Sequence, residues 1–159
     1  NFKKVPISKY GNTKYLAEKY IVKKFKKKRI NYCIGRIFSF THKNQKKSFV
    51  IPGINEKIKK NKKINLTNIN HYRDFVSTKD ICKAVEALRI ANARGIYNIG
   101  SGKKTSITKV ANFFSKHYNK EIIIKNNNNP TYLIANIDKI KKIGWKANDK
   151  IEDILKSFF

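Results

Sequence analysis

The sequence predicts an α/β protein whose strands form a parallel sheet. Stretches with the strand pattern alternate with stretches whose apolar residues recur at helical spacing, an order typical of a sheet covered by helices. The stretch 30–38 is mostly apolar on both faces, as a strand buried in a parallel sheet would be. No internal repeat or linker divides the 159 residues, a length that fits one ordinary domain or part of a larger protein.

The first half of the chain is expected to form a helix over 8–28, a strand over 30–38, a polar loop over 41–47, a helix over 48–61 and strands over 63–66 and 72–76. The second half is expected to form a helix between 77 and 95, a strand over 96–99, a tight turn over 100–102, a helix over 107–118, a strand over 121–125, a loop over 126–131, a helical turn over 138–143 and a helix over 150–158.

The helices are predicted from apolar residues at three- and four-residue spacing and from capping residues at their starts. Ser8, Ser77 and either Thr105 or Ser106 carry the hydroxyl oxygen that an N-cap uses. Asp80 follows Ser77 in the pattern of a capping box, so we expect Asp80 to act as a cap.

The strands are short apolar runs bounded by turn residues. Gly95 is expected to end the helix before the strand 96–99, and Gly144 to close the helical turn. Gly100-Ser101-Gly102 reads as a tight turn. A lone Gly-x-Gly is a weak signal for phosphate binding, so we interpret this turn as structural.

The chain is strongly basic, with 37 Lys and Arg residues against 10 Asp and Glu, a net charge of +27. Such a charge is compatible with a nucleic acid or an anionic membrane as partner. The lysines are scattered, and Lys, Asn and Ile are all used heavily, which favours compositional drift; a nucleic-acid-binding protein stays the alternative. No apolar run approaches the ~18 residues of a membrane span, so no membrane partner is expected.

Cys33 and Cys82 are the only cysteines, and each lies among apolar neighbours. We therefore expect two buried, reduced thiols rather than a disulfide or a metal site, which fits a cytoplasmic protein. His42, His71 and His117 have no metal-ligand spacing, so no metal site is predicted.

Tyr10 and Lys14 are the candidate catalytic pair. Residues four apart on a helix share one face, with about 5–6 Å between their Cβ atoms. An ammonium group that close favours the phenolate form of a tyrosine, which makes Tyr10 a candidate general acid/base near neutral pH. The pair belongs to a stripe with helical spacing: Tyr10, Lys14, Ala17, Ile21 and Phe25. The competing interpretation is a core tyrosine beside a lysine that reaches out to solvent.

The residues around this pair read Pro6-Ile7-Ser8-Lys9-Tyr10-Gly11-Asn12-Thr13-Lys14 and continue with Ala17-Glu18. This segment resembles the active-site helix of the extended short-chain dehydrogenase/reductase family, the NAD(P)-dependent nucleotide-sugar epimerases, dehydratases and reductases. Further segments that match the family in the same order are 36–39, 49–52, 72–80, 97–102 and 143–145.

The resemblance implies roles for the candidate residues. Tyr10 would exchange a proton with a sugar hydroxyl or keto oxygen, Lys14 would bind the nicotinamide ribose, and Phe38 would lie beside the cofactor. Ser39 takes the place of a frequent Asn that binds substrate, and Phe49 stands where some relatives have a second catalytic His.

Two basic residues are implied as contacts of the nucleotide-diphosphate sugar. Arg73 lies in the segment Arg73-Asp74-Phe75, and a guanidinium group binds phosphate oxygens with two parallel hydrogen bonds. Lys57 falls where relatives have a basic contact to the sugar nucleotide.

The resemblance implies the C-terminal half of a Rossmann-type parallel sheet protein plus its smaller substrate-binding domain. Residues 1–40 and about 72–100 would complete the sheet, and about 41–71 and 101–159 would form the substrate-binding part. The Gly-x-Gly-x-x-Gly turn that binds a dinucleotide does not occur in the sequence. We therefore expect the N-terminal βαβ units to be missing, and NAD or NADP to bind only together with them.

The implied activity of the complete enzyme is reduction, epimerisation or dehydration of a nucleotide-activated sugar, because all three reactions share these residues. Among them we favour a 4-keto-sugar reductase or epimerase, working as a homodimer, with the fragment alone inactive. The alternatives are the basic nucleic-acid-binding protein and a non-catalytic remnant of the enzyme.

Overall fold

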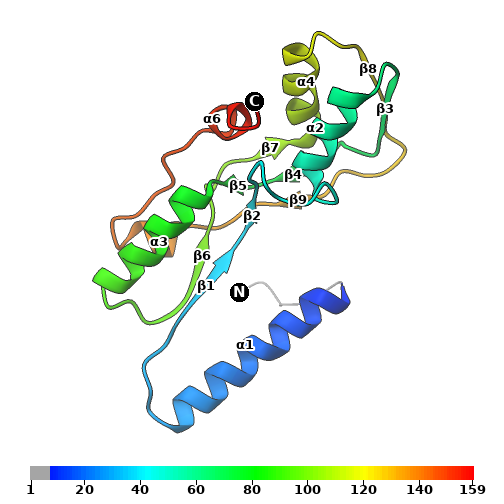
Figure 1. Cartoon of the computed structure of the whole chain (residues 1–159). Coiled ribbons are helices and arrows are strands. Elements are labelled where there is room, and N and C mark those ends of the chain that lie inside the picture. Colours follow the sequence, from blue (N-terminus) through cyan, green and yellow to red (C-terminus); the bar gives the residue numbers. More distant parts are fainter. Residues whose placement is uncertain (1–7) are drawn as a thin grey trace.

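The computed structural model describes residues 8–159, and its strands and helices alternate along the chain (Figure 1). Pro6 and Ile7 of the predicted motif lie outside the described residues. The elements are α1 (Lys9–Lys27), β1 (Cys33–Ile37), β2 (Ser39–Phe40), α2 (Val50–Lys60), β3 (Ile64–Thr67), β4 (Tyr72–Arg73), β5 (Phe75–Val76), α3 (Thr78–Ile90), β6 (Gly95–Ile99), β7 (Thr105–Ser106), α4 (Ile107–His117), β8 (Ile122–Lys125), β9 (Tyr132–Leu133), α5 (Asp138–Lys141) and α6 (Ile151–Lys156).

Parallel pairing dominates the sheets, as predicted. β1 pairs with β6, β2 with β5 and β3 with β8, and all three pairs are parallel. β4 lies between β7, to which it is antiparallel, and β9, to which it is parallel. The expected α/β class with a parallel sheet is confirmed.

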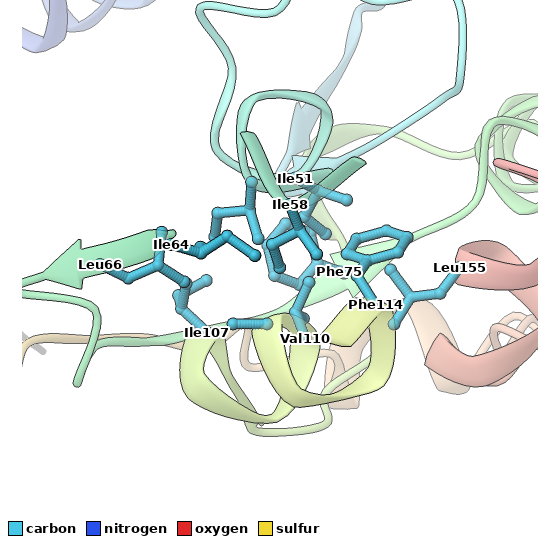
Figure 2. Close-up of a cluster of buried hydrophobic side chains, with 11 residues drawn as sticks. Ile51, Ile58, Ile64, Leu66, Phe75, Ile107, Val110, Phe114 and Leu155 are labelled. Atoms are coloured by element: carbon cyan, nitrogen blue, oxygen red, sulfur yellow. The ribbon is translucent and has the colours of Figure 1, made fainter. Parts of the chain in front are cut away.

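The buried side chains form two clusters. The first holds α2 and α4 against β3 and the C-terminal α6, and Figure 2 shows its members Ile58, Val110, Phe114 and Leu155 meeting between these elements. The second packs α3 and β6 against the segment that leads through α5 to Trp145. Each cluster thus joins segments far apart in the sequence. The division into a sheet part and a substrate part stays a prediction.

The predicted helix starts are confirmed. The hydroxyl oxygens of Ser8, Ser77 and Ser106 accept hydrogen bonds from the backbone three residues later, at 3.0, 3.0 and 3.4 Å. Asp80 differs from the expectation, because its carboxylate does not cap α3. Its Oδ2 accepts from the backbone N–H groups of Asn148 and Asp149 instead, so Asp80 ties α3 to the C-terminal segment.

The end of α3 also differs from the prediction. The helix ends at Ile90, five residues before Gly95. Asn92 has a φ of 45°, and this left-handed conformation turns the chain out of the helix. Gly95, with a φ of 89°, begins β6 rather than ending the helix.

The predicted apolar face of α1 is wrong by about one position. Tyr10, Lys14, Ala17 and Ile21 are exposed, and no described residue of α1 is buried. The half-buried residues of the helix are instead Gly11, Tyr15, Glu18, Val22 and Phe25. This face makes a long-range ion pair, in which the Glu18 carboxylate binds the Arg36 guanidinium of β1 through two hydrogen bonds, and the Phe25 ring contacts that of Tyr32. The Glu18 face therefore lies toward the sheet, and Figure 1 shows α1 apart from the other helices.

The predicted burial of β1 and of both cysteines is wrong. Cys33 and Cys82 are free thiols, as expected, but both are exposed, and Ile37 is 49% exposed. Among residues 8–159, β1 pairs along one edge only, with β6. On one face, a hollow of about 350 Å³ between β1 and α3 reaches Cys33 and Gly35. Apolar side chains of β1 are therefore left exposed by the rest of the described residues.

Candidate active site

One cavity gathers the candidate residues Tyr10, Phe38, Ser39 and Arg73 from separate segments of the chain. Its volume is about 310 Å³, and α1, β1, β2, α2 and the β4–β5 segment contribute to its walls. It is lined by Tyr10, Ile37, Phe38, Ser39, Phe40, Thr41, Gln45, Phe49, Val50, Ile51, Pro52, Arg73 and Phe75. A larger hollow of about 550 Å³ lies near Ser101 and Lys146, and none of the candidate residues lines it. The smaller cavity is therefore the candidate active site.

Tyr10 reaches this cavity from the first turn of α1, whose start is fixed by the Ser8 cap. The Lys14 Nζ lies 5.4 Å from the centroid of the Tyr10 ring, so the helix places the two side chains together as predicted. Tyr10 is 74% exposed, and Lys14 is exposed beside it without lining the cavity. The phenol therefore stands at the rim of the cavity, open to a ligand on its outer side.

The same helix repeats the tyrosine–lysine spacing twice. The Lys19 Nζ lies 5.5 Å from the centroid of the Tyr15 ring, and Lys24 lies 5.5 Å from that of Tyr20. Tyr15 and Tyr20 line a different hollow, on the side of α1 near Ile96. Spacing alone does not distinguish the three pairs, and the cavity does, because Tyr10 alone of these tyrosines lines it.

Arg73 enters the cavity from β4 with part of its guanidinium group unused. Its Nη1 donates to the backbone carbonyls of Tyr72, at 2.8 Å, and Thr131, at 3.1 Å. Among residues 8–159, the Nε and Nη2 atoms have no hydrogen-bond partner. These two N–H donors lie side by side and match the two oxygens of a phosphate group.

Asp74, the next residue, is completely buried and holds the turn 100–102 in place. Its carboxylate accepts hydrogen bonds from Ser101 N at 2.7 Å, Ser101 Oγ at 2.5 Å, Gly102 N at 2.8 Å and Ala135 N at 3.1 Å. A Cβ atom at Gly100 would lie 2.7 Å from Asp74 Oδ2, so only glycine allows this approach. The predicted structural role of the turn is thereby confirmed.

The structure does not bring Lys57 into the cavity. Its Nζ donates to the backbone carbonyl of Asn65 at 2.6 Å, so the side chain links α2 to β3 instead. Ser39, Phe38 and Phe49 do line the cavity. Thr41 and Gln45 also line it and were missed, although the position of Thr41 two residues after Ser39 could have indicated a shared face.

The loop before α2 forms one wall of the cavity and is tied to that helix. A Cβ atom at Gly53 would lie 2.6 Å from the backbone oxygen of Lys47, so the loop runs directly against α2. The Glu56 carboxylate accepts from the Nζ atoms of Lys47 and Lys60, both at 2.7 Å. The hydrogen bond from Lys47, then that from Lys60, lowers the pKa of Glu56 from 4.5 to about 2.

We expect the Glu56 carboxyl to titrate near pH 2 in the folded protein and to return toward 4.5 in Lys47→Ala. Because the pKa is lower in the folded state, the stabilisation is complete above about pH 4.5 and is lost as the pH falls through about 2. Carboxyl NMR measures the midpoint, with Lys46→Ala as the matched control that leaves it unchanged. A wild-type midpoint near 4.5 would show that the loop is not held by this contact.

Neither a metal centre nor a membrane helix is found in the described part of the chain. No group of three or more His, Cys, Asp or Glu side chains lies close enough to hold an ion. No helix between residues 8 and 159 combines the length and the apolar character needed to cross a bilayer.

Comparison with known proteins gives a family and a fold. The family model described as GDP-mannose 4,6 dehydratase matches residues 1–158. A Methanocaldococcus jannaschii protein named "Putative UDP-glucose 4-epimerase" is 31% identical over 160 residues, which make up 95% of this chain and 52% of that protein. The chain thus spans about half the length of this curated relative.

Solved structures agree with this match. RMD from Pseudomonas aeruginosa, complexed with NADPH, has a TM-score of 0.88 at 20% identity, with 98% of this chain and 56% of that chain covered. UDP-glucose 4-epimerase from Thermotoga maritima, solved with UDP-glucose, has a TM-score of 0.81 at 22% identity, with coverages of 99% and 57%. At these identities the likeness shows the Rossmann-type fold. With the family match over nearly its whole length, the chain belongs to the GDP-mannose 4,6-dehydratase family of NAD-dependent epimerases and dehydratases.

Proposed function

We propose that the chain supplies the substrate-binding half and the tyrosine–lysine pair of an NAD(P)-dependent enzyme that acts on a nucleotide-activated sugar, as a 4-keto-sugar reductase or epimerase. The observation that carries the proposal is the single cavity that Tyr10, Phe38, Ser39 and Arg73 all line. These residues come from segments up to 63 positions apart, and the family motifs imply a role for each of them.

We assign each side chain of the site a role that fits its chemistry. The Tyr10 phenol would give or take a proton at the reacting sugar oxygen, and the Lys14 ammonium, with its Nζ 5.4 Å from the centroid of the Tyr10 ring, would bind the nicotinamide ribose. The unused Nε and Nη2 donors of Arg73 would hold the diphosphate, and Ser39 would bind the sugar. The apolar part of the lining, which includes Ile37, Ile51 and Phe75, offers surface to the apolar atoms of a ligand.

The residues fit the nicotinamide end of NAD(P), since the Phe38 ring and the Tyr10 phenol line one cavity and the Lys14 Nζ has no carboxylate partner in the described chain. NAD(P), when bound, would accept or return the hydride. RMD, a structural neighbour, was solved with NADPH, which supports this cofactor class. The homodimer, and the need for an N-terminal half that carries the pyrophosphate turn, stay predictions.

Arg73→Ala is expected to weaken binding of UDP-glucose or GDP-mannose by about 10- to 100-fold, because two charge-assisted hydrogen bonds to the diphosphate are lost. Titration calorimetry on the full-length protein measures the loss, and Arg94→Ala, an exposed arginine outside the cavity, is the matched control. Equal affinities for wild type and Arg73→Ala would remove Arg73 from the site.

The net charge of +27 favours one second candidate, a nucleic-acid-binding protein. The same variants titrated with duplex DNA at about 0.15 M salt separate the two functions. We expect weak, sequence-independent DNA binding that Arg73→Ala leaves unchanged. The reason is that many dispersed lysines would contact the DNA phosphates, so the loss of one arginine changes the total charge contact little. Nanomolar, sequence-selective binding would favour the nucleic-acid function instead.

A further inference from the structure

Thr41 carries a buried hydroxyl group that nothing in the described chain uses. The residue is 3% exposed, and its Oγ1 has no hydrogen-bond partner among residues 8–159. Buried polar groups in folded proteins are nearly always hydrogen-bonded, since an unpaired one destabilises the folded state. A hydroxyl kept in this condition therefore points to a partner that is not part of the chain.

The position of Thr41 identifies where that partner binds. Thr41 lines the candidate active-site cavity, directly after β2 and two residues beyond Ser39, which lines it too. Residues two apart on an extended segment are about 6–7 Å from each other, so the two hydroxyl groups lie within reach of one small ligand. The backbone of the next residue is fixed, because the His42 N–H donates to Gln45 Oε1 at 3.1 Å.

The chemistry of the cavity indicates which part of a nucleotide sugar Thr41 meets. Arg73 provides the positive charge that a diphosphate requires, through donors that are still unused. A threonine hydroxyl is neutral and both donates and accepts, which matches a sugar hydroxyl with the same two capacities. The buried neighbours Ile51, Pro52 and Phe75 in the same lining offer apolar surface to the C–H groups of a sugar ring.

We propose that the Thr41 hydroxyl hydrogen-bonds a hydroxyl group of the sugar ring and so helps to select the sugar. The inference rests on the proposed function, because it takes the ligand to be a nucleotide sugar. It adds a specificity residue that acts on the sugar and leaves the nucleotide to Arg73.

The test compares Thr41→Val, which keeps the shape and removes the hydroxyl, with Thr41→Ser, which keeps the hydroxyl. Affinities of the full-length protein are measured for UDP-glucose against UDP and for GDP-mannose against GDP. Thr41→Val is expected to lower the affinity for the nucleotide sugar about tenfold, as the loss of one hydrogen bond implies. The affinity for the bare nucleotide should not change. Thr41→Ser is expected to bind like the wild type.

A second readout needs no ligand. Because the hydroxyl is unpaired in the free protein, Thr41→Val is expected to unfold at the same temperature as the wild type or higher. A lower unfolding temperature or a failure to fold would mean that the hydroxyl has a structural partner, which overturns the inference. Equal losses for sugar nucleotide and bare nucleotide, or no loss, would overturn it too. If the wild type binds none of the four ligands, the proposed function fails, and this inference fails with it.

Discussion

Tyr10→Phe is expected, under the proposed function, to lower turnover by about 10²- to 10⁴-fold, the usual contribution of a general acid/base. The substitution removes one oxygen atom from a side chain that is 74% exposed at the rim of the cavity, so the fold should be unaffected. Substrate affinity should change little, because Arg73 and the sugar contacts remain. The measurement is the steady-state rate with NAD(P) and the nucleotide sugar, together with the unfolding temperature.

The two other tyrosine–lysine pairs of α1 are matched controls. Tyr20 also lies four residues before a lysine and is 63% exposed, but it does not line the cavity. Tyr20→Phe should therefore keep full turnover, and so should Tyr15→Phe. Lys14→Met should lose turnover on the scale of Tyr10→Phe, while Lys24→Met should not. Equal rates for Tyr10→Phe and Tyr20→Phe would show that the motif is a coincidence of composition.

The features that were predictable from the sequence are those that nearby residues decide. The Ser8 and Ser77 caps work through backbone groups three residues away, so the local pattern is enough. The α/β fold class was predictable because each strand and helix has a local pattern of apolar residues. The end of α3 was missed because an Asn at position 92 takes up the left-handed conformation before Gly95 is reached.

The features that were not predictable depend on distant partners. The inward face of α1 carries the contact of Glu18 with Arg36, 18 residues away, together with half-buried Tyr15, Val22 and Phe25, and no local spacing indicates these partners. Lys57 does not make the expected substrate contact, because its Nζ donates to the Asn65 carbonyl on β3. The cavity itself joins residues whose proximity no spacing rule encodes. The family resemblance brought Tyr10 and Arg73 into one prediction. The spacing of Thr41 from Ser39 could have indicated a shared face, but that its hydroxyl is buried and unpaired is seen only in the structure.

Asp74→Ala is expected to destabilise the protein by about 3–5 kcal/mol, because the backbone N–H groups of Ser101, Gly102 and Ala135 together lose the only acceptor they have among residues 8–159. At the usual entropy of unfolding for a chain of this length, this corresponds to a fall in unfolding temperature on the order of 10 °C. Differential scanning calorimetry at neutral pH measures it. Asp138→Ala, which removes an exposed carboxylate, is the control and should change the temperature little.

The size of this effect follows from the number of groups that the Asp74 carboxylate holds in place. The turn 100–102 has no sheet partner of its own, and Asp74 meets it at distances of 2.5–2.8 Å while the segment before α5 is held by the same oxygen Oδ2. One side chain thus joins three segments at the residue after Arg73, so its loss should loosen the strand that positions the guanidinium. Asp74→Asn should be intermediate, because an amide keeps one acceptor oxygen but turns N–H donors toward N–H donors. A wild-type unfolding temperature in Asp74→Ala would contradict the buried network.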